Sequence, residues 1–474
     1  MTHYLSISEI QKDLREKRIT CVELVNYFLT RIKELKHLNA FLDVYEEEAI
    51  SHAKKSDEKI KNGQMGRLTG LVMGLKDVIC YKNHPVQASS KILNGFHSIY
   101  NATAVERLLN EDVNIIGRLN CDEFAMGASN ENSAFGHVHN FVDETRVSGG
   151  SSGGSAVAVQ ANLCHAALGS DTGGSVRQPA SFCGIVGLKP TYSRISRYGL
   201  IAYASSFDII GTLTKSVEDA ALLLEIMAGK DEYDSTVSSS EVQQYSKEIL
   251  PAKKYKIAYI KDYLENPAIN FSIRRETENF ISLLKDRKHT IEGVDFPFLD
   301  YMVPTYYLLT TAEASANLAR YDGLRYGQRA EGIHELENLY KKSRTEGFGE
   351  EVKRRIMLGT FVLSEGFQDA YFTKAQKVRR VIKDKTMEIL ADYDFILTPT
   401  TPSTAFKLGE HTQDPVQMYL QDIFTVQASL AGIPAVSFPF GKDDDNLPIG
   451  LQLMGREFCE GDLLNLVNQF VNCP

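Results

Sequence analysis

The chain has 474 residues, of which 43% are hydrophobic, and a formal net charge of −9 at pH 7. This length can bury a large core, and the acidic balance argues against a protein whose main task is to grip DNA or RNA, because binding phosphates requires concentrated Lys and Arg. No apolar run reaches the roughly 18 residues that span a bilayer, and the first residues lack the regions of a signal peptide. We therefore expect a soluble, cytoplasmic, globular protein that binds neither membrane nor DNA.

The cysteine and histidine patterns do not predict disulfides or a metal site. Seven cysteines are dispersed along the chain, and none forms Cys-x-x-Cys, so we expect reduced thiols that fill the core. His137 and His139 lie two residues apart, but no third ligand nearby completes a metal-binding spacing. We expect no metal ion in this chain.

The first half of the chain begins with amphipathic helices. Apolar residues recur at helical spacing from Leu14 to Ile32, and Thr20-Cys-Val-Glu23 fits a capping box. Strands and helices then alternate, which favours an α/β architecture with helices on both faces of a mostly parallel sheet. In chain order, we predict a strand at 71–75, a helix at 103–110, a strand at 114–117, a helix at 155–163 and a strand at 164–168.

The second half begins with a polar, serine-rich stretch at 229–240, which we interpret as a surface connection. Strands reappear near the C-terminus, which indicates that this part rejoins the same sheet. In chain order, we predict a strand at 255–260, a helix near 273–284, a mainly helical block from about 311 to 390, and strands at 395–397, 435–438 and 449–453.

Two glycine-rich loops that carry serines are the most informative feature of the sequence. The first is Gly149-Gly-Ser-Ser-Gly-Gly-Ser155, and the second is Gly169-Ser-Asp-Thr-Gly-Gly-Ser175. A glycine before a serine allows backbone dihedrals that other residues avoid and lets a substrate approach the peptide plane. Hydroxyls beside bare backbone N–H groups favour acyl chemistry with an oxyanion site.

Other interpretations of these loops are a phosphate cradle and the nucleophile elbow of an α/β-hydrolase. Neither loop matches Gly-x-x-x-x-Gly-Lys-Ser/Thr or a Gly-x-Gly-x-x-Gly that opens a βαβ unit. The run Gly149-x-Ser151-x-Gly153 matches the elbow, but the residues before it are polar and no later histidine carries a motif that marks a base. A third interpretation adds Lys76, which ends a short apolar strand and would project toward both loops.

Together these segments resemble the amidase signature family. The resemblance rests on 74–77, 149–155, 169–180 and 184–191, and matches run from about 60 to 225 and resume in the last third. It implies one large α/β amidase-signature fold with a mixed, mostly parallel sheet. We therefore predict a single domain over 1–474, with N-terminal helices (1–65), a catalytic motif region (66–225), a surface connection (226–250) and a C-terminal part that completes the sheet and the substrate pocket (251–474).

The resemblance also implies a Ser–cis-Ser–Lys triad. A serine hydroxyl is a poor nucleophile unless a base removes its proton, and Ser151 can relay that proton from Ser175 to Lys76. Lys76 must then be neutral, which requires a pKa lowered by burial or by N–H donors. The implied oxyanion site consists of the backbone N–H groups of Thr172, Gly173, Gly174 and Ser175.

Four further polar residues in these loops receive no chemical role from the sequence. Ser152 and Ser155 are more typical of turn and helix-capping residues. We expect Asp171 and Arg177 to orient the second loop rather than to take part in the chemistry.

Further segments resemble the glutaminase subunits of tRNA-dependent amidotransferases: 123–135, 197–200, 348–360, 369–372 and 418–422. This resemblance implies that Arg355 binds the α-carboxylate of glutamine, that Asp422 binds its ammonium group and that Tyr306 lines the same pocket. A planar guanidinium can meet a carboxylate with two hydrogen bonds. The pattern leaves open which of Arg354 and Arg355 faces inward, and we favour Arg355.

The implied activity is hydrolysis of the glutamine side-chain amide. The ammonia would pass to a B subunit, which uses ATP and Mg²⁺ to amidate Glu-tRNA(Gln), Asp-tRNA(Asn) or both and makes most of the contact with tRNA, while a small C subunit tightens the assembly. No cofactor is expected in this chain. The alternatives are a stand-alone amidase for another small amide and a non-catalytic scaffold. The intact Lys76, Ser151 and Ser175 argue against a scaffold, and Arg355 with Asp422 argues against neutral or lipophilic amides.

Overall fold

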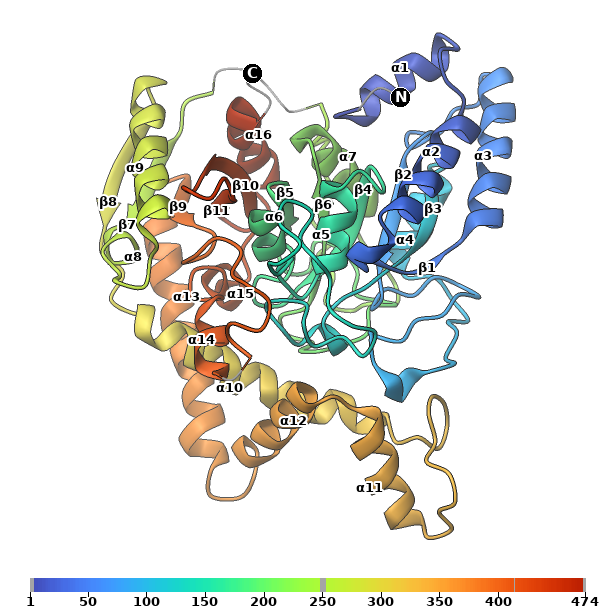
Figure 1. Cartoon of the computed structure of the whole chain (residues 1–474). Coiled ribbons are helices and arrows are strands. Elements are labelled where there is room, and N and C mark those ends of the chain that lie inside the picture. Colours follow the sequence, from blue (N-terminus) through green and yellow to red (C-terminus); the bar gives the residue numbers. More distant parts are fainter. Residues whose placement is uncertain (1–3, 248–252, 413, 472–474) are drawn as a thin grey trace.

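The computed structural model describes residues 4–247, 253–412 and 414–471. Eleven strands within these ranges form one continuous sheet, in the order β1-β3-β2-β4-β6-β5-β10-β11-β9-β7-β8, so both halves of the chain contribute to it (Figure 1). The strands are β1 Phe41–Val44, β2 Val72–Lys76, β3 Asn114–Leu119, β4 Ala166–Asp171, β5 Val186–Lys189, β6 Ile209–Thr214, β7 Lys256–Ile260, β8 Thr290–Val294, β9 Phe395–Pro399, β10 Ala435–Lys442 and β11 Pro448–Gly455.

The sheet is mixed, as predicted, but the expectation that it is mostly parallel is wrong. Among the described strands, four neighbouring pairs are parallel (β3–β2, β2–β4, β9–β7 and β7–β8) and the other six are antiparallel. The reason lies in the connections. A helical crossover places two strands in parallel, whereas only a short turn joins β10 to β11, and no α-helix lies between β5 and β6.

Helices cover both faces of the sheet. On one side, α5 (Gly153–Gln160) packs on α6 (Arg177–Cys183), and on the other, α7 (Val217–Met227) packs on α16 (Glu460–Val471); α6 and α16 both contact β10. The remaining α-helices are α1 Ile7–Arg15, α2 Cys21–Glu34, α3 Glu46–Lys61, α4 Thr103–Asn110, α8 Lys261–Leu264, α9 Phe271–Asp286, α10 Leu299–Asn317, α11 Leu336–Gly347, α12 Glu350–Val362, α13 Lys374–Asp392, α14 Pro415–Leu420 and α15 Val426–Ala431.

Most of the predicted elements are present. Helix α4 has the predicted bounds, and seven strands (β2, β3, β4, β7, β9, β10 and β11) overlap predicted ones. The capping box of α2 is also confirmed, because the Thr20 hydroxyl accepts from the Glu23 N–H at 3.1 Å while the Glu23 carboxylate accepts from the Thr20 N–H at 2.8 Å. The division of the domain into regions stays a prediction, and residues 248–250 of its surface connection lie outside the described ranges.

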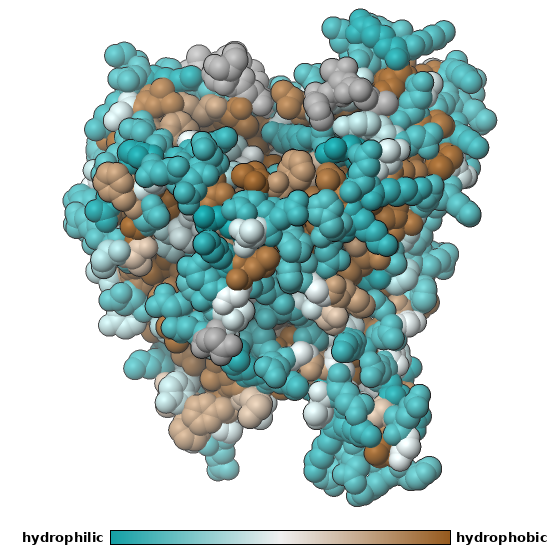
Figure 2. Space-filling view, viewed as in Figure 1, coloured by the Kyte–Doolittle hydropathy of each residue, from teal (hydrophilic) through white to brown (hydrophobic). Residues whose placement is uncertain are grey.

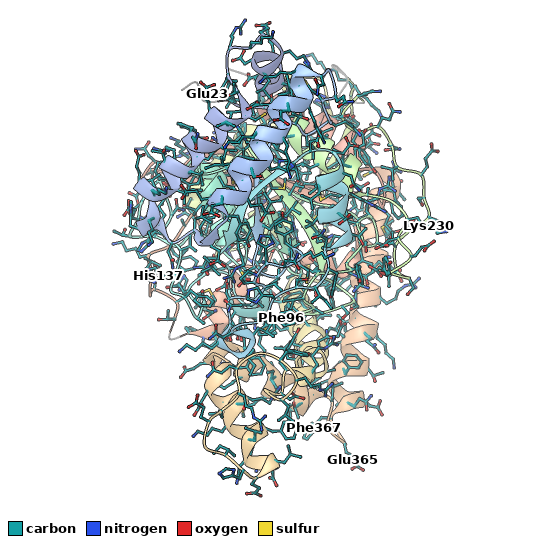
Figure 3. All side chains as sticks on the ribbon, turned by 90° about the vertical axis from the view of Figure 1, so that its right-hand side faces the viewer. Glu23, Phe96, His137, Lys230, Glu365 and Phe367 are labelled. Carbon is teal, nitrogen blue, oxygen red and sulfur yellow. The ribbon has the colours of Figure 1, made fainter. Side chains whose placement is uncertain are left out.

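Helices α10 to α13 extend to the end of the molecule that lies lowest in Figure 1. Figure 3 shows Phe367 and Glu365 at this end, whereas Glu23 of the N-terminal helices lies at the opposite end. Four large apolar or aromatic side chains are exposed on these helices and the turn between them: Met357, Phe361, Phe367 and Tyr371. Figure 2 shows some hydrophobic surface at this end of the molecule. Within the described ranges, no helix is both long and apolar enough to cross a bilayer.

The capping box of α2 gives a first test of the fold. We expect Thr20→Ala to lower the free energy of unfolding by about 1 kcal/mol, because the first turn of the helix loses a side-chain acceptor. Denaturant titration, together with amide hydrogen exchange of α2, would measure the change. The matched control is Thr30→Ala in the same helix, where the exposed hydroxyl bonds only to the Asn26 carbonyl, at 2.9 Å; an equal loss in both variants would contradict the role of the cap.

Candidate active site

The side chain of Lys76, the last residue of β2, lies among three serine hydroxyls. Its Nζ donates to Ser151 Oγ at 2.7 Å, to Ser152 Oγ at 2.9 Å and to Ser170 Oγ at 3.0 Å. The contact with Ser170 follows from the fold, since β2 pairs in parallel with β4, which carries Ser170. The structure therefore joins Lys76 to Ser151 and adds Ser152, which the sequence favours as structural, and Ser170, which sequence reasoning missed.

Burial controls the protonation of Lys76. The side chain is fully buried, and its hydrogen-bond partners are hydroxyls rather than carboxylates. Removal from water disfavours the charged amine and lowers its pKa from 10.5 to about 8, although nearby acidic groups, including Cys121 and Asp122, oppose the shift. An amine with this pKa can exchange a proton near neutral pH, as a general base requires.

The first glycine loop contains a cis peptide bond between Gly150 and Ser151. The Gly150 N–H donates to Gln178 Oε1 at 2.8 Å, and the Ser151 carbonyl accepts from the Asp122 N–H at 3.1 Å. A side chain could not replace the hydrogen at Gly150, because its Cβ would lie 2.1 Å from Asp122 Oδ2. The loop is thus held from both sides, and its last three residues form the start of α5.

The second glycine loop links β4 to α6 and leaves several backbone donors free. Within the described residues, the N–H groups of Gly173, Gly174 and Ser175 make no hydrogen bond to another group of the chain. A Cβ at Gly173 would lie 2.5 Å from the ring of Tyr306, and at Gly174, where φ is +152°, it would lie 2.3 Å from Thr425 Oγ1. Only glycine therefore fits at positions 173 and 174. An oxyanion site needs free backbone N–H groups that point toward one place, and this loop provides such groups.

Thr172 and Ser175 differ in how the loop presents them. The Thr172 hydroxyl donates to Asp208 Oδ1 at 2.6 Å, so this side chain supports the loop. The Ser175 carbonyl accepts from the Ser152 N–H at 3.2 Å, which places the two glycine loops side by side. Ser175 is 8% exposed, whereas Lys76 and Ser151 are fully buried, so Ser175 is the member of the predicted triad that lies nearest to solvent.

A buried ion pair supports the second loop, as the sequence leads us to expect. Arg177 Nη2 and Asp171 Oδ1 lie 2.9 Å apart, and Asp171 also accepts from the Val176 N–H at 3.2 Å. Burial alone would raise the pKa of Asp171, but the guanidinium of Arg177 offsets it, so the pKa lies below its usual value. Arg177 also donates to the Thr425 carbonyl at 2.7 Å and so links the loop to the C-terminal half.

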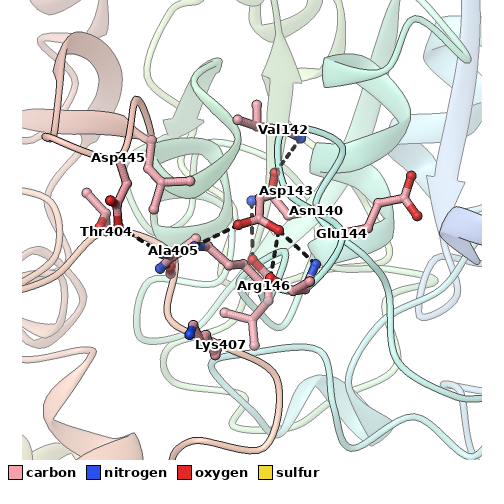
Figure 4. Close-up of polar contacts among 12 residues, drawn as sticks. Asn140, Val142, Asp143, Glu144, Arg146, Thr404, Ala405, Lys407 and Asp445 are labelled. Atoms are coloured by element: carbon pink, nitrogen blue, oxygen red, sulfur yellow. Dashed lines mark hydrogen bonds and ion pairs between the residues drawn. The ribbon is translucent and has the colours of Figure 1, made fainter.

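The segment before the first glycine loop is held by Arg146. This guanidinium donates to Asp143 Oδ2 at 3.1 Å, to the Ala405 carbonyl at 2.7 Å and to Asp445 Oδ2 at 3.0 Å (Figure 4). The Val147 N–H donates to the Phe406 carbonyl at 3.0 Å. Loops from both halves of the chain therefore fix the approach to Ser151.

Arg355 of α12 points inward, whereas its neighbour Arg354 is about half exposed. Arg355 Nε donates to Glu351 Oε1 at 2.8 Å, and Nη1 donates to the hydroxyl of Tyr203 at 3.0 Å. Its Cζ lies 5.1 Å from the ring centre of Tyr307, and two further rings lie at similar distances, those of Tyr203 and Tyr419. Within the described residues, Nη2 has no hydrogen-bond partner, so it is free for a ligand.

Tyr307, which sequence reasoning missed, connects Arg355 to Asp422. Its hydroxyl donates to Asp422 Oδ2 at 3.2 Å while its ring lies beside the guanidinium. Burial raises the pKa of Asp422 to about 7, and Arg355 partly offsets the shift. Tyr306, one residue earlier, instead packs against Gly173, and so it lies beside the second glycine loop. The adjacent tyrosines of α10 thus serve the two parts of the site.

A cavity of about 270 Å³ opens next to Arg355, and Gly127, Ser129, Glu351 and Tyr419 are also among its walls. It is smaller than the pockets typical of drug-sized ligands, so it suits a small molecule. Of the predicted site residues within the described ranges, only Arg355 lines it directly.

The chain belongs to the amidase family, because the family model described as Amidase matches residues 23–464. It is 49% identical over 473 residues to the A subunit of glutamyl-tRNA(Gln) amidotransferase from Chlorobium phaeobacteroides (strain BS1), with 98% of each chain covered. The protein of the same name from Coxiella burnetii (strain Dugway 5J108-111) is also 49% identical, over 99% of this chain and 97% of that one. The crystal structure of the corresponding protein from Thermotoga maritima superposes with a TM-score of 0.77 at 39% identity, covering 98% of this chain and 96% of that chain.

The lowered pKa of Lys76 predicts a pH dependence of amide hydrolysis. Below pH 8 the amine is mostly protonated and cannot accept a proton, so kcat/KM should rise with pH and level off above about 8. Ammonia release measured from pH 6 to 10 would show the rise, with Lys76→Ala as the inactive control. A wild-type profile that stays flat across this range would remove Lys76 as the base.

The difference between Arg355 and Arg354 predicts that only one of them tolerates lysine. Arg355→Lys loses the planar fork and the stacking on tyrosine, so we expect the KM for glutamine to rise by about tenfold or more. Arg354→Lys is the matched control, because it keeps a surface charge near Glu351 and should leave KM within about twofold. Steady-state kinetics of both variants test the assignment, and similar KM values in the two would contradict it.

Proposed function

We propose that this chain is the glutaminase subunit of a tRNA-dependent amidotransferase and hydrolyses the side-chain amide of glutamine. The observation that carries the proposal is the 2.7 Å contact between the buried amine of Lys76 and Ser151, next to the loop of Ser175. The end-to-end identity of 49% to proteins named as the A subunit of glutamyl-tRNA(Gln) amidotransferase supports the choice of reaction.

In the first step, Ser175 Oγ attacks the carboxamide carbon of glutamine. Its proton passes to Ser151, which gives its own proton to the neutral amine of Lys76. The carbonyl oxygen gains negative charge and is held by backbone N–H groups of the second loop, those of Thr172, Gly173, Gly174 and Ser175. Removing one donor from such a site typically costs about 2.7–4 kcal/mol of barrier.

In the second step, the C–N bond breaks, and the proton returns from Lys76 through Ser151 to the departing nitrogen, which leaves as ammonia. The glutamyl group remains as an ester on Ser175. Water then attacks this ester, the same relay takes its proton, and glutamate and the free hydroxyl of Ser175 are released.

Opposite charges in the site suit the zwitterionic end of glutamine. Within the described residues, Arg355 uses Nε and Nη1 for hydrogen bonds, which leaves Nη2 free to bind the α-carboxylate. Asp422 binds the ammonium group, and a cation beside this buried carboxyl would lower its pKa and favour the ionised form. Tyr306 lines the path between them and the second glycine loop.

The protein acts within a larger assembly, since its relatives are named as one subunit of an amidotransferase. The ammonia passes to a B subunit, which uses ATP and Mg²⁺ to activate Glu-tRNA(Gln), Asp-tRNA(Asn) or both, and a C subunit completes the complex. The net charge of −9 is consistent with a chain that leaves most of the tRNA contact to a partner.

Substitution of the nucleophile tests the proposal. In the assembled complex, Ser175→Ala should release no ammonia from glutamine, yet should still amidate charged tRNA when ammonium salt supplies the nitrogen. The control is Ser155→Ala, because the Ser155 hydroxyl bonds to the Leu168 carbonyl at 3.0 Å rather than to Lys76. Ammonia release by Ser175→Ala would rule out this nucleophile, and full activity on unrelated amides without partners would indicate a stand-alone amidase.

A further inference from the structure

Buried polar atoms without a hydrogen-bond partner gather at three consecutive residues. Among the described residues, the side-chain atoms Ser129 Oγ, Asn130 Oδ1, Asn130 Nδ2 and Glu131 Oε2 are buried and unpaired. Buried polar atoms in proteins nearly always have a partner, so four such atoms in one short segment require an explanation. A partner that is not part of the chain is the simplest one.

Of these three residues, Ser129 is the one that is deeply buried and also lines a cavity. Its exposed fraction is 1%, and it lines the 270 Å³ cavity that Arg355 also lines. Asn130 is fully buried and is not among the described residues that line this cavity, and Glu131 lines it but already accepts from the Gly409 N–H at 2.7 Å. The hydroxyl of Ser129 is therefore the unpaired group best placed to meet a ligand.

Ser129 is also fixed in place close to the first glycine loop. A Cβ at Gly150 would lie 2.7 Å from the Ser129 nitrogen, so the two backbones are in contact. The next residue is anchored as well, because the Asn130 N–H donates to Asp122 Oδ2 at 2.9 Å. A hydroxyl on so rigid a segment keeps its position when a ligand binds, which reduces the entropic cost of the contact.

The cavity is lined by more carboxylates than arginines, so a neutral hydrogen-bond donor would help it to bind an anion. Arg354 and Arg355 face three carboxylates, those of Glu131, Glu350 and Glu351, and both arginines bond to Glu351. One free guanidinium nitrogen must therefore hold an anionic ligand beside several negative charges. A hydroxyl donor adds a hydrogen bond to the anion without adding a charge that a carboxylate could neutralise.

We propose that the Ser129 hydroxyl binds the α-carboxylate of glutamine together with Arg355, an inference that rests on the proposed glutaminase function. The serine contacts the end of the substrate that does not react. It therefore determines specificity for an amino acid over an amide without a carboxylate, and it contributes to binding rather than to bond breaking.

The test compares glutamine with 4-aminobutanamide, which is glutamine without its α-carboxylate. In the assembled complex, Ser129→Ala should raise the KM for glutamine by about tenfold or more, the effect of losing one hydrogen bond to a charged group, and should leave kcat within about twofold. The kcat/KM for 4-aminobutanamide, or its Ki as a competitor where turnover is too slow, should not change. Ser129→Thr, which keeps the hydroxyl, should restore most of the preference.

Stability separates this role from a structural one. Ser129→Ala should not lower the melting temperature, since its hydroxyl has no partner within the described chain. The matched control is Ser133→Ala, which removes a hydroxyl that donates to Asn120 Oδ1 at 2.7 Å and should cost stability while keeping the preference for glutamine.

Three results would overturn the inference: an unchanged KM for glutamine in Ser129→Ala, a lower kcat at unchanged KM, or an equal loss with 4-aminobutanamide. Wild-type ammonia release from glutamine distinguishes this failure from failure of the proposed function. If the wild type releases none, the proposed function fails and the inference fails with it. If the wild type releases ammonia and Ser129→Ala behaves as the wild type does, only the inference is wrong.

Discussion

The site depends on a buried amine that has no carboxylate in contact with it. Lys76 satisfies its donors with three serine hydroxyls, so no carboxylate bonds directly to the buried amine. Acidic groups farther away oppose the effect of burial only in part, and the pKa of Lys76 drops to about 8. The nearest carboxylates are each bonded elsewhere: Asp122 to backbone N–H groups, Asp171 to Arg177, and Asp208 to Thr172. These bonds keep the acids away from the amine, and an acid in contact with it would restore the charged form.

The arrangement of strands explains why distant segments meet at this amine. The parallel pairing of β2 with β4 aligns the end of β2 with the start of the second glycine loop. The C-terminal half then supports that loop from the other side, since Thr425 lies against Gly174 and its carbonyl accepts from Arg177. A loop this rich in glycine would be mobile on its own. Support from Tyr306 and Thr425 converts it into a rigid set of backbone donors.

The sequence alone could identify the chemistry but not all of its surroundings. The glycine loops, Lys76 and the helix at 103–110 are marked by local patterns, which can be recognised in a single sequence. Strands β5 and β6 were missed, although they are no more buried than β2, β3 and β4. No helix separates β5 from β6, so the alternation of strands and helices on which the prediction relied does not continue through them. Ser170 and Tyr307 were missed because they reach the site only through strand pairing and the packing of α10 on α12.

The tyrosines around Arg355 stabilise its buried guanidinium as a cation. Glu351 meets the guanidinium from one turn earlier on the same helix, and three aromatic rings lie around it, so the cation does not rely on water. Tyr307 connects this aromatic cluster to Asp422, because its hydroxyl donates to the carboxylate. A cation and an acid held on either side of one rigid ring define a fixed separation of opposite charges. A ligand that carries both charges at that separation gains from both contacts, whereas a neutral amide gains from neither.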